Sequence, residues 1–230
     1  MAVESVTSPF KRDELVQTFW QGQDLTDFPV MTVSSDSIDL YRAHGVAKGA
    51  WWYAQYPPEE GIGGRFDLPK GGGYGTCYAA NNPFTALRER HGPRLMKARL
   101  LPREIFSDCR VSPVPPKQVF RTASLTAGGE AAFSVKATEM SCSAKYEITR
   151  TWALAWHGHG RQGVWYRPGW DPRDGAMSLA MFGRIGESAG PITPPGSQRG
   201  EKYIPEFSAA FGVEVLEPLA RGQARIEDLK

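Results

Sequence analysis

The spacing of hydrophobic and polar residues changes several times along the chain, and each spacing predicts a different element. Residues 9–20 and 144–158 place apolar side chains three or four positions apart, which is typical of amphipathic helices. Residues 37–43 alternate between apolar and polar side chains, and residues 75–80 form a short apolar run, so both predict strands. Further short strands are expected within 95–125 and at 163–167, 176–182 and 212–217.

The segment after residues 75–80 carries the clearest helix signals in the chain. Asn82 is suited to cap a helix, and Pro83 is suited to its first helical position. Gly92 followed by Pro93 predicts that this helix ends there. Such a helix would carry Thr85, Ala86 and Glu89 on one side.

Glycine and proline predict the loops. Residues 57–75 hold prolines and a series of glycines, so they predict a loop that surrounds Arg65. Residues 186–205 are rich in Gly, Pro and Ser and predict a surface segment. The strands are short and irregularly spaced, and there is no series of strand–helix–strand units with a glycine fingerprint. The pattern therefore favours an α+β fold over a doubly wound sheet.

Composition narrows the classes of function. The 230 residues fit a single domain over 1–230, with 41% hydrophobic residues, 23% charged residues and a formal net charge of +2. The sequence contains no concentrated stripe of basic residues, so it does not predict nucleic-acid binding. The three cysteines are widely spaced, which disfavours a disulfide framework and a zinc ribbon. No signal segment or long apolar run is visible, so we expect a cytoplasmic protein without a membrane span and without a metal.

Four residues between positions 42 and 89 combine the chemistry needed to act on a dinucleotide. Arg42 and Arg65 offer planar guanidinium groups that can bind the phosphates of a pyrophosphate. Tyr78 offers an aromatic face with a polar tip, and Glu89 offers a carboxylate that can stabilise a positively charged sugar. Each residue also has a purely structural interpretation. The arginines could form structural ion pairs, Tyr78 could pack in the core, and Glu89 could be a surface residue of an exposed helix that pairs with a neighbouring arginine.

The order of short motifs around these residues resembles the RES domain family, the toxins of bacterial toxin–antitoxin systems that pair with an Xre-like antitoxin. The resemblance covers about residues 36–185 and leaves 186–230 as a Pro/Gly-rich segment and C-terminal extension. The matching segments are Leu40-Tyr41-Arg42, Gly64-Arg65-Phe66-Asp67, Gly75-Thr76-Cys77-Tyr78-Ala79-Ala80, Ala86-Leu87-Arg88-Glu89, Gly163-Val164-Trp165-Tyr166 and Ser178-Leu179-Ala180-Met181-Phe182-Gly183.

The resemblance implies an ADP-ribosyltransferase-like fold, a split and mostly antiparallel sheet with flanking helices around an NAD cleft. NAD would be the substrate, and its nicotinamide–ribose bond would be cleaved by hydrolysis or phosphorolysis. The partners would be an Xre-like antitoxin, inorganic phosphate or a protein acceptor, and a second copy of the chain in a homodimer. The implied catalytic residues are Glu89, Arg42 and Tyr78, and the implied NAD-binding residues are Arg42, Arg65 and Tyr78. Tyr41 and His44 are further candidates for NAD binding from their positions beside Arg42, since His44 follows it by two residues and could share its face.

The chain departs from the family pattern at one position. The family serine, two residues after the tyrosine that matches Tyr166, is replaced by Pro168, which has neither a hydroxyl nor a backbone N–H. Ser178 is a candidate replacement. Three functions stay open: an NAD-cleaving toxin, an ADP-ribosyltransferase that modifies a protein, and a non-catalytic module that binds NAD or an antitoxin.

Overall fold

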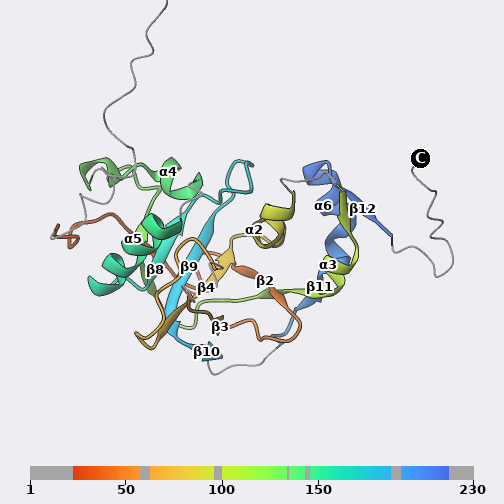
Figure 1. Cartoon of the computed structure of the whole chain (residues 1–230), viewed down its shortest axis with the longest axis horizontal. Helices are drawn as coiled ribbons and strands as arrows, with labels where there is room; N and C mark the ends of the chain where they lie inside the picture. The colour runs from red at the N-terminus through yellow and green to blue at the C-terminus, as the bar shows by residue number, and fades with distance from the viewer. Residues whose placement is uncertain are drawn as a thin grey trace, which may run out of the picture.

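The fold is built on one large, mostly antiparallel sheet (Figure 1). The computed structural model describes residues 23–56, 63–95, 100–133, 135–142, 146–187 and 193–217. The eight strands lie in the order β1-β7-β8-β9-β4-β2-β6-β11, and only β7 and β8 run parallel. Their bounds are β1 (Val30–Val33), β2 (Tyr41–Gly45), β4 (Tyr74–Ala80), β6 (Cys109–Pro113), β7 (Phe120–Ser124), β8 (Gly163–Tyr166), β9 (Ser178–Arg184) and β11 (Gln198–Arg199).

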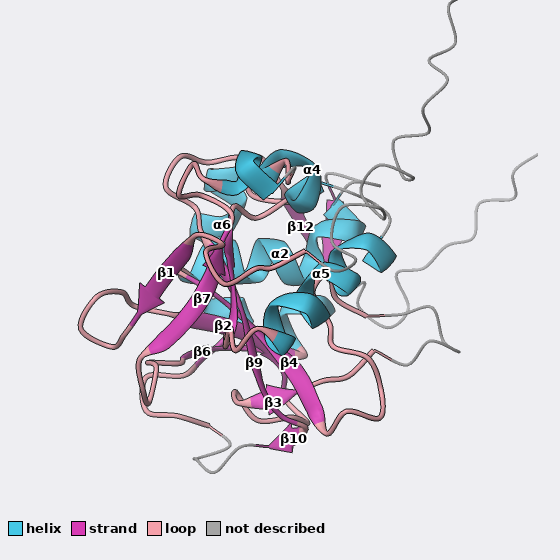
Figure 2. Ribbon diagram, turned by 90° about the vertical axis from the view of Figure 1, so that its left-hand side faces the viewer, coloured by secondary structure: helices cyan, strands magenta, loops and turns pink. Residues whose placement is uncertain are grey.

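Two small sheets and a set of helices surround this sheet. The strand β3 (Trp52–Tyr53) pairs with β10 (Gly186–Glu187), and β5 (Leu100–Pro102) pairs in parallel with β12 (Glu214–Leu216). Figure 2 shows α2 and α5 on one side of the sheet, with β3 and β10 on the other. The helices are α2 (Pro83–Leu95), α3 (Glu104–Ser107), η2 (Glu130–Phe133), α4 (Ala137–Cys142), α5 (Tyr146–Gly158), η3 (Gly200–Tyr203) and α6 (Ile204–Phe211).

The large sheet is split between β2 and β4. These strands pair at a single position, Tyr41 with Ala80, whereas β4 and β9 pair from Tyr74–Arg184 through to Ala80–Ser178. The strand β2 instead follows β6 along its whole length. The fold is therefore α+β, as the sequence pattern predicts, with the split, mostly antiparallel sheet that the family resemblance implies.

Side-chain alternation along the strands separates the hydrophobic core into layers. On β9, Leu179 and Met181 belong to a cluster with Trp51 on one face of the sheet, whereas Ala180 belongs to the cluster under α5 on the other face. This alternation follows from the two-residue period of a strand. A third cluster lies beside α2 and is built around the side chain of Phe207 from α6.

Several predicted elements are confirmed within a few residues. The strands β4, β8, β9 and β12 and the helix α5 form where the sequence predicts them. The expected loop before β4 is also present at its described residues, 63–73. The helix predicted at 9–20 lies outside the described residues. None of the described helices is long and apolar enough to cross a membrane.

The predicted end of the second helix is wrong. α2 continues through Gly92 and Pro93 to Leu95. Gly92 is required by a close approach, because a Cβ there would lie 2.2 Å from Cγ of the Trp170 ring. Pro93 removes only one internal hydrogen bond, the one to the carbonyl of Glu89, and the helix continues past it.

Other boundaries also need correction. The strand expected at 37–43 begins only at Tyr41, because Ser34 and Ser37 form a hydrogen-bonded turn before it. Leu154, expected on the buried side of its helix, is 45% exposed. Within the expected surface segment 186–205, residues 198–205 form β11, η3 and the first turn of α6, and only Gly200 among these eight is buried. The strand β11 forms because it pairs with β6, a contact between distant segments that local composition does not encode.

Candidate functional site

A cavity of about 520 Å³ opens beside the split in the sheet. Its walls come from β2, β4, β8, β9, α2, α5 and the loop that holds Arg65. Four residues predicted from the sequence line it together: Arg42, Arg65, Tyr78 and Glu89. The volume lies in the range of about 300–1,000 Å³ typical of small-molecule sites. The fold thus gathers onto one surface residues that three different elements and a loop supply.

Glu89 enters the cavity from α2. Asn82 caps this helix as predicted, since its Oδ1 accepts a hydrogen bond from the backbone N–H of Thr85 at 2.8 Å. The Oε1 of Glu89 accepts a hydrogen bond from the backbone N–H of Trp170 at 3.0 Å. Burial raises the pKa of Glu89 to about 7, although this hydrogen bond and the nearby Arg65 act in the opposite direction. Near neutral pH this carboxyl group therefore exists in both its protonated and its ionised form.

Arg65 lies in the cavity wall and is only 7% exposed. Its Nη1 donates to the carbonyl oxygen of Met140 at 3.3 Å. Its guanidinium group lies over the ring of Tyr146, with Cζ 4.9 Å from the ring centroid. The hydroxyl of Thr149 donates to the backbone oxygen of Arg65. The Arg65 side chain is thus held in the cavity wall by a hydrogen bond and by an aromatic ring, while Thr149 holds its backbone.

Arg42 has firm structural contacts as well as a place in the cavity wall. Its Nη1 donates to the carbonyl oxygens of Ala50 at 3.1 Å and Trp52 at 2.6 Å, and it lies against the sulfur of Cys77. These contacts tie β2 to the connection that leads to β3. Arg42 therefore has a structural role in holding the backbone at Ala50 and Trp52, and a direct contact between Arg42 and phosphate stays a prediction.

Tyr78 fixes the loop that carries Arg65. Its hydroxyl donates to Oδ1 of Asp67 at 2.8 Å and accepts from the backbone N–H of Phe66 at 2.8 Å. The other carboxylate oxygen of Asp67 accepts from the backbone N–H of Gly64 at 2.6 Å. Burial raises the pKa of Asp67 above its ordinary value. The sequence analysis names no role for Asp67. Its position two residues after Arg65, in the same glycine-rich loop, is the signal that could have identified it as a residue that orders this loop.

Removing the Tyr78 hydroxyl is expected to destabilise the protein. Tyr78→Phe leaves the carboxylate of Asp67 and the N–H of Phe66 without their shared partner, so we expect a loss of about 1–3 kcal/mol in the free energy of unfolding. Urea unfolding measures this loss. Tyr74→Phe, at an exposed position of the same strand, is the matched control and is expected to have little effect. Equal stability of the two variants would contradict the structural role of the hydroxyl.

Tyr41 and His44 are not among the described residues that line the cavity. Tyr41 packs against the third hydrophobic cluster. His44 is 3% exposed; its Nδ1 lies 2.8 Å from the carbonyl oxygen of Lys48, and its Nε2 lies 2.8 Å from the hydroxyl of Ser112. Because a carbonyl only accepts, Nδ1 carries the proton and Nε2 accepts from the serine. A role of Tyr41 or His44 in NAD binding stays a prediction without a contact in this cavity.

Ser178, and not Pro168, lies in the cavity wall. Pro168 borders a separate cavity of about 280 Å³. Ser178 is the first residue of β9, pairs with Tyr166 of β8 and is almost fully buried. The structure therefore places a hydroxyl-bearing residue in the wall of the site even though the position of the family serine is occupied by proline.

Aromatic side chains for which the sequence predicts no role in the site complete the cavity wall. Tyr146, Tyr166 and Trp170 line it, and Arg90 adds a further cation. Tyr166 lies in a motif that was recognised as part of the family pattern. Tyr146 and Trp170 reach the cavity only through tertiary packing, so no local spacing signals them. Among the described residues, no group of three or more His, Cys, Asp or Glu side chains is placed to hold a metal ion.

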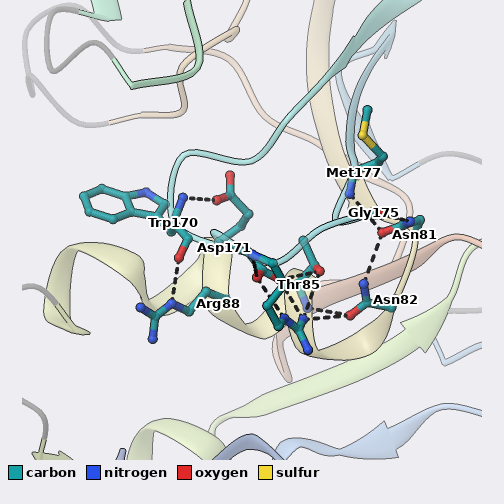
Figure 3. Close-up of polar contacts among 10 residues, drawn as sticks. Asn81, Asn82, Thr85, Arg88, Trp170, Asp171, Gly175 and Met177 are labelled. Atoms are coloured by element: carbon teal, nitrogen blue, oxygen red, sulfur yellow. Dashed lines mark hydrogen bonds and ion pairs between the residues drawn. The ribbon is translucent and has the colours of Figure 1, made fainter. Parts of the chain in front are cut away.

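The segment that follows β8 is fastened to α2 by a polar network (Figure 3). Arg88 donates through Nε to the carbonyl oxygen of Trp170 at 2.7 Å. The hydroxyl of Thr85 donates to Asp171 at 2.6 Å, and Arg173 forms an ion pair with the same carboxylate at 2.7 Å. The backbone of Trp170 is therefore held on both sides, with its carbonyl bound to Arg88 and its N–H bound to Glu89.

Comparison with known proteins agrees with the motif pattern. The family model described as the RES domain matches residues 39–189, which is more than half of the chain and includes all the predicted site residues. The chain belongs to the RES domain family. This RES protein also resembles a chain of the crystal structure of the M. tuberculosis MbcT–MbcA toxin–antitoxin complex. The two share 16% sequence identity with a TM-score of 0.51, over 75% of this chain and 89% of that one. A search of curated proteins finds no match.

Proposed function

We propose that this RES protein is an NAD-consuming toxin of a bacterial toxin–antitoxin system, acting in the cytoplasm. The observation that carries the proposal is the cavity that Arg42, Arg65, Tyr78 and Glu89 line together. Membership of the RES family and a fold shared with a chain of a toxin–antitoxin complex support it. The proposed partner is an Xre-like antitoxin, and a homodimer remains a prediction.

The proposed reaction breaks the bond between nicotinamide and ribose. The bonding electron pair leaves with the nicotinamide nitrogen and neutralises its positive charge, so no general acid is needed. The ribose carbon then carries oxocarbenium-like positive charge, which the ionised carboxylate of Glu89 stabilises. Arg42 and Arg65, two guanidinium groups in the cavity wall, would hold the pyrophosphate.

Water or inorganic phosphate would then attack the same ribose carbon. Attack by water gives ADP-ribose, and attack by phosphate gives its 1″-phosphate. Glu89 would also accept the proton of the attacking group. Transfer of ADP-ribose to a protein side chain follows the same chemistry with a different nucleophile and is the second candidate. The place of Ser178 in the wall supports a catalytic site over a non-catalytic binding module.

A cellular experiment tests the toxin proposal. Expression of the chain in a bacterial host is expected to stop growth and to lower cellular NAD, and co-expression of an Xre-like antitoxin encoded beside it is expected to reverse both effects. A fall in growth with unchanged NAD would contradict NAD consumption as the toxic activity.

The activity is expected to depend on pH near neutrality. The ionised form of Glu89 is the working form, and burial raises its pKa to about 7, against the opposing effects of the Trp170 hydrogen bond and Arg65. The value of kcat/KM should therefore fall as the pH drops below about 7 and level off above it. Measuring the rate of nicotinamide release over a series of pH values tests this fall in kcat/KM. A rate that is flat down to the ordinary glutamate pKa of 4.5 would show that Glu89 does not act as the carboxylate.

A further inference from the structure

The segment that follows the RES match contacts two arginines near the site through one aromatic side chain. Residues 193–217 form β11, η3, α6 and β12, and α6 lies near α2 in Figure 1. Phe211, the last residue of α6, is half-buried and packs against Phe207 with ring centroids 4.8 Å apart. Phe207 is fully buried in the third hydrophobic cluster. The ring of Phe211 therefore has a fixed support beneath it.

Two arginine side chains stack on the ring of Phe211. The Cζ atom of Arg88 lies 4.6 Å from the ring centroid, and the Cζ atom of Arg173 lies 4.5 Å from it. Guanidinium groups are attracted to an aromatic ring by its quadrupole and pack well against it because they are planar. One ring thus adds a packing restraint on two long side chains, beside the hydrogen bonds that each of them makes.

Both arginines hold the backbone segment that carries the hydrogen-bond donor to Glu89. Arg88 donates through Nε to the carbonyl of Trp170, and Arg173 forms a two-point pair with the buried carboxylate of Asp171 at 2.9 and 2.7 Å. The backbone N–H of Trp170 is in turn bound to Glu89 at 3.0 Å. A continuous set of contacts thus runs from α6 to the carboxylate in the cavity.

We propose that Phe211 is a positioning residue for Glu89, and that the C-terminal extension of this chain supports the active site. The ring of Phe211 packs against Arg88 and Arg173. Arg88 binds the carbonyl of Trp170, and Arg173 binds the carboxylate of Asp171. The backbone N–H of Trp170 then donates to the carboxylate of Glu89. The kinetic part of this inference rests on the proposed NAD cleavage. The structural part, the hold on Trp170, does not.

The kinetic test compares two truncations in α6. Phe211→Ala is expected to lower kcat for nicotinamide release by about 10- to 100-fold with little change in KM for NAD, because a displaced carboxylate weakens transition-state stabilisation more than substrate binding. Phe211→Tyr keeps the ring and should restore kcat. Ile204→Ala removes an apolar contact with the same cluster at the other end of α6 and is expected to leave kcat unchanged.

Hydrogen exchange of the Trp170 amide, followed by NMR, tests the inference without any activity. Phe211→Ala is expected to speed this exchange by about tenfold or more relative to wild type, whereas Phe211→Tyr and Ile204→Ala are not. Unchanged Trp170 exchange in Phe211→Ala would overturn the proposal, as would equal acceleration in Ile204→Ala. If the wild-type protein releases no nicotinamide, the proposed function fails while the exchange data still decide the positioning role.

Discussion

Glu89→Gln is expected to lower nicotinamide release from NAD by about 10²–10⁴-fold while the protein stays folded. The amide keeps the size of the side chain and can still accept the hydrogen bond from the backbone N–H of Trp170. It carries no negative charge, so it cannot stabilise an oxocarbenium-like ribose or accept a proton from the attacking group. The measurement is the initial rate of nicotinamide release at a pH near 8, where Glu89 is mostly ionised.

Glu147→Gln is the matched control for this variant. Glu147 is an exposed residue in the first turn of α5, so the same chemical change there should leave the rate unchanged. A Glu89→Gln variant that keeps more than about a tenth of the wild-type rate would exclude Glu89 as the group that stabilises the transition state.

Thermal unfolding of Glu89→Gln gives an independent check of the raised pKa. The folded-state pKa of about 7 lies above the ordinary value of 4.5, so the folded protein binds more protons than the unfolded chain between these values. The stability of the wild type therefore falls as the pH rises from about 4.5 to 7, relative to a chain that lacks this group. The melting temperature of Glu89→Gln relative to wild type should be higher at pH 8 than at pH 5. The opposite trend would mean that the pKa of Glu89 is not raised.

Gly64→Ala is expected to damage both the fold and the activity. A Cβ at Gly64 would lie 2.4 Å from the hydroxyl oxygen of Tyr78 and 2.5 Å from its Cζ. That hydroxyl is held by Asp67 and Phe66, so it cannot retreat without breaking both hydrogen bonds. We expect a loss of about 1–3 kcal/mol in the free energy of unfolding. The adjacent Arg65 should be displaced with the loop, so nicotinamide release should fall as well.

Gly72→Ala provides the control for Gly64→Ala. A Cβ at Gly72 would meet no atom within 4 Å, and this residue lies in the same glycine-rich stretch before β4. Its effect on stability should stay within about 0.5 kcal/mol. Urea unfolding and the rate of nicotinamide release measure both variants. A Gly64→Ala protein as stable and active as Gly72→Ala would show that the contact between Gly64 and Tyr78 does not constrain the loop.

Much of the fold follows from local signals in the sequence. The cap at Asn82 and the apolar run of residues 75–80 place α2 and β4 next to each other in the chain, and the structure confirms both. The order of the eight strands and the parallel pair of β7 and β8 depend on contacts between distant segments. The helix end at Gly92 was mispredicted for the same reason, since the Trp170 ring that requires a glycine there is far away in the sequence.

The residues of the candidate site were also predicted only in part from the sequence. Arg65, Tyr78 and Glu89 lie within a short stretch of sequence whose motifs are recognisable, and the fold brings them to one cavity. The partners that hold them were harder to predict. Trp170 donates to Glu89 from 81 positions along the chain, and no spacing rule connects the two residues. Asp67, by contrast, lies beside Arg65 and could have been recognised as the acceptor that orders its loop.

The most direct test of the account is incubation of the purified protein with NAD, with and without inorganic phosphate, while nicotinamide and the ribosyl product are quantified. We expect the wild-type protein to release nicotinamide and Glu89→Gln to lose this release. ADP-ribose as the product in both conditions would identify hydrolysis, and ADP-ribose 1″-phosphate formed only with phosphate would identify phosphorolysis. Absence of nicotinamide release in both conditions would contradict the claim that this cavity cleaves NAD.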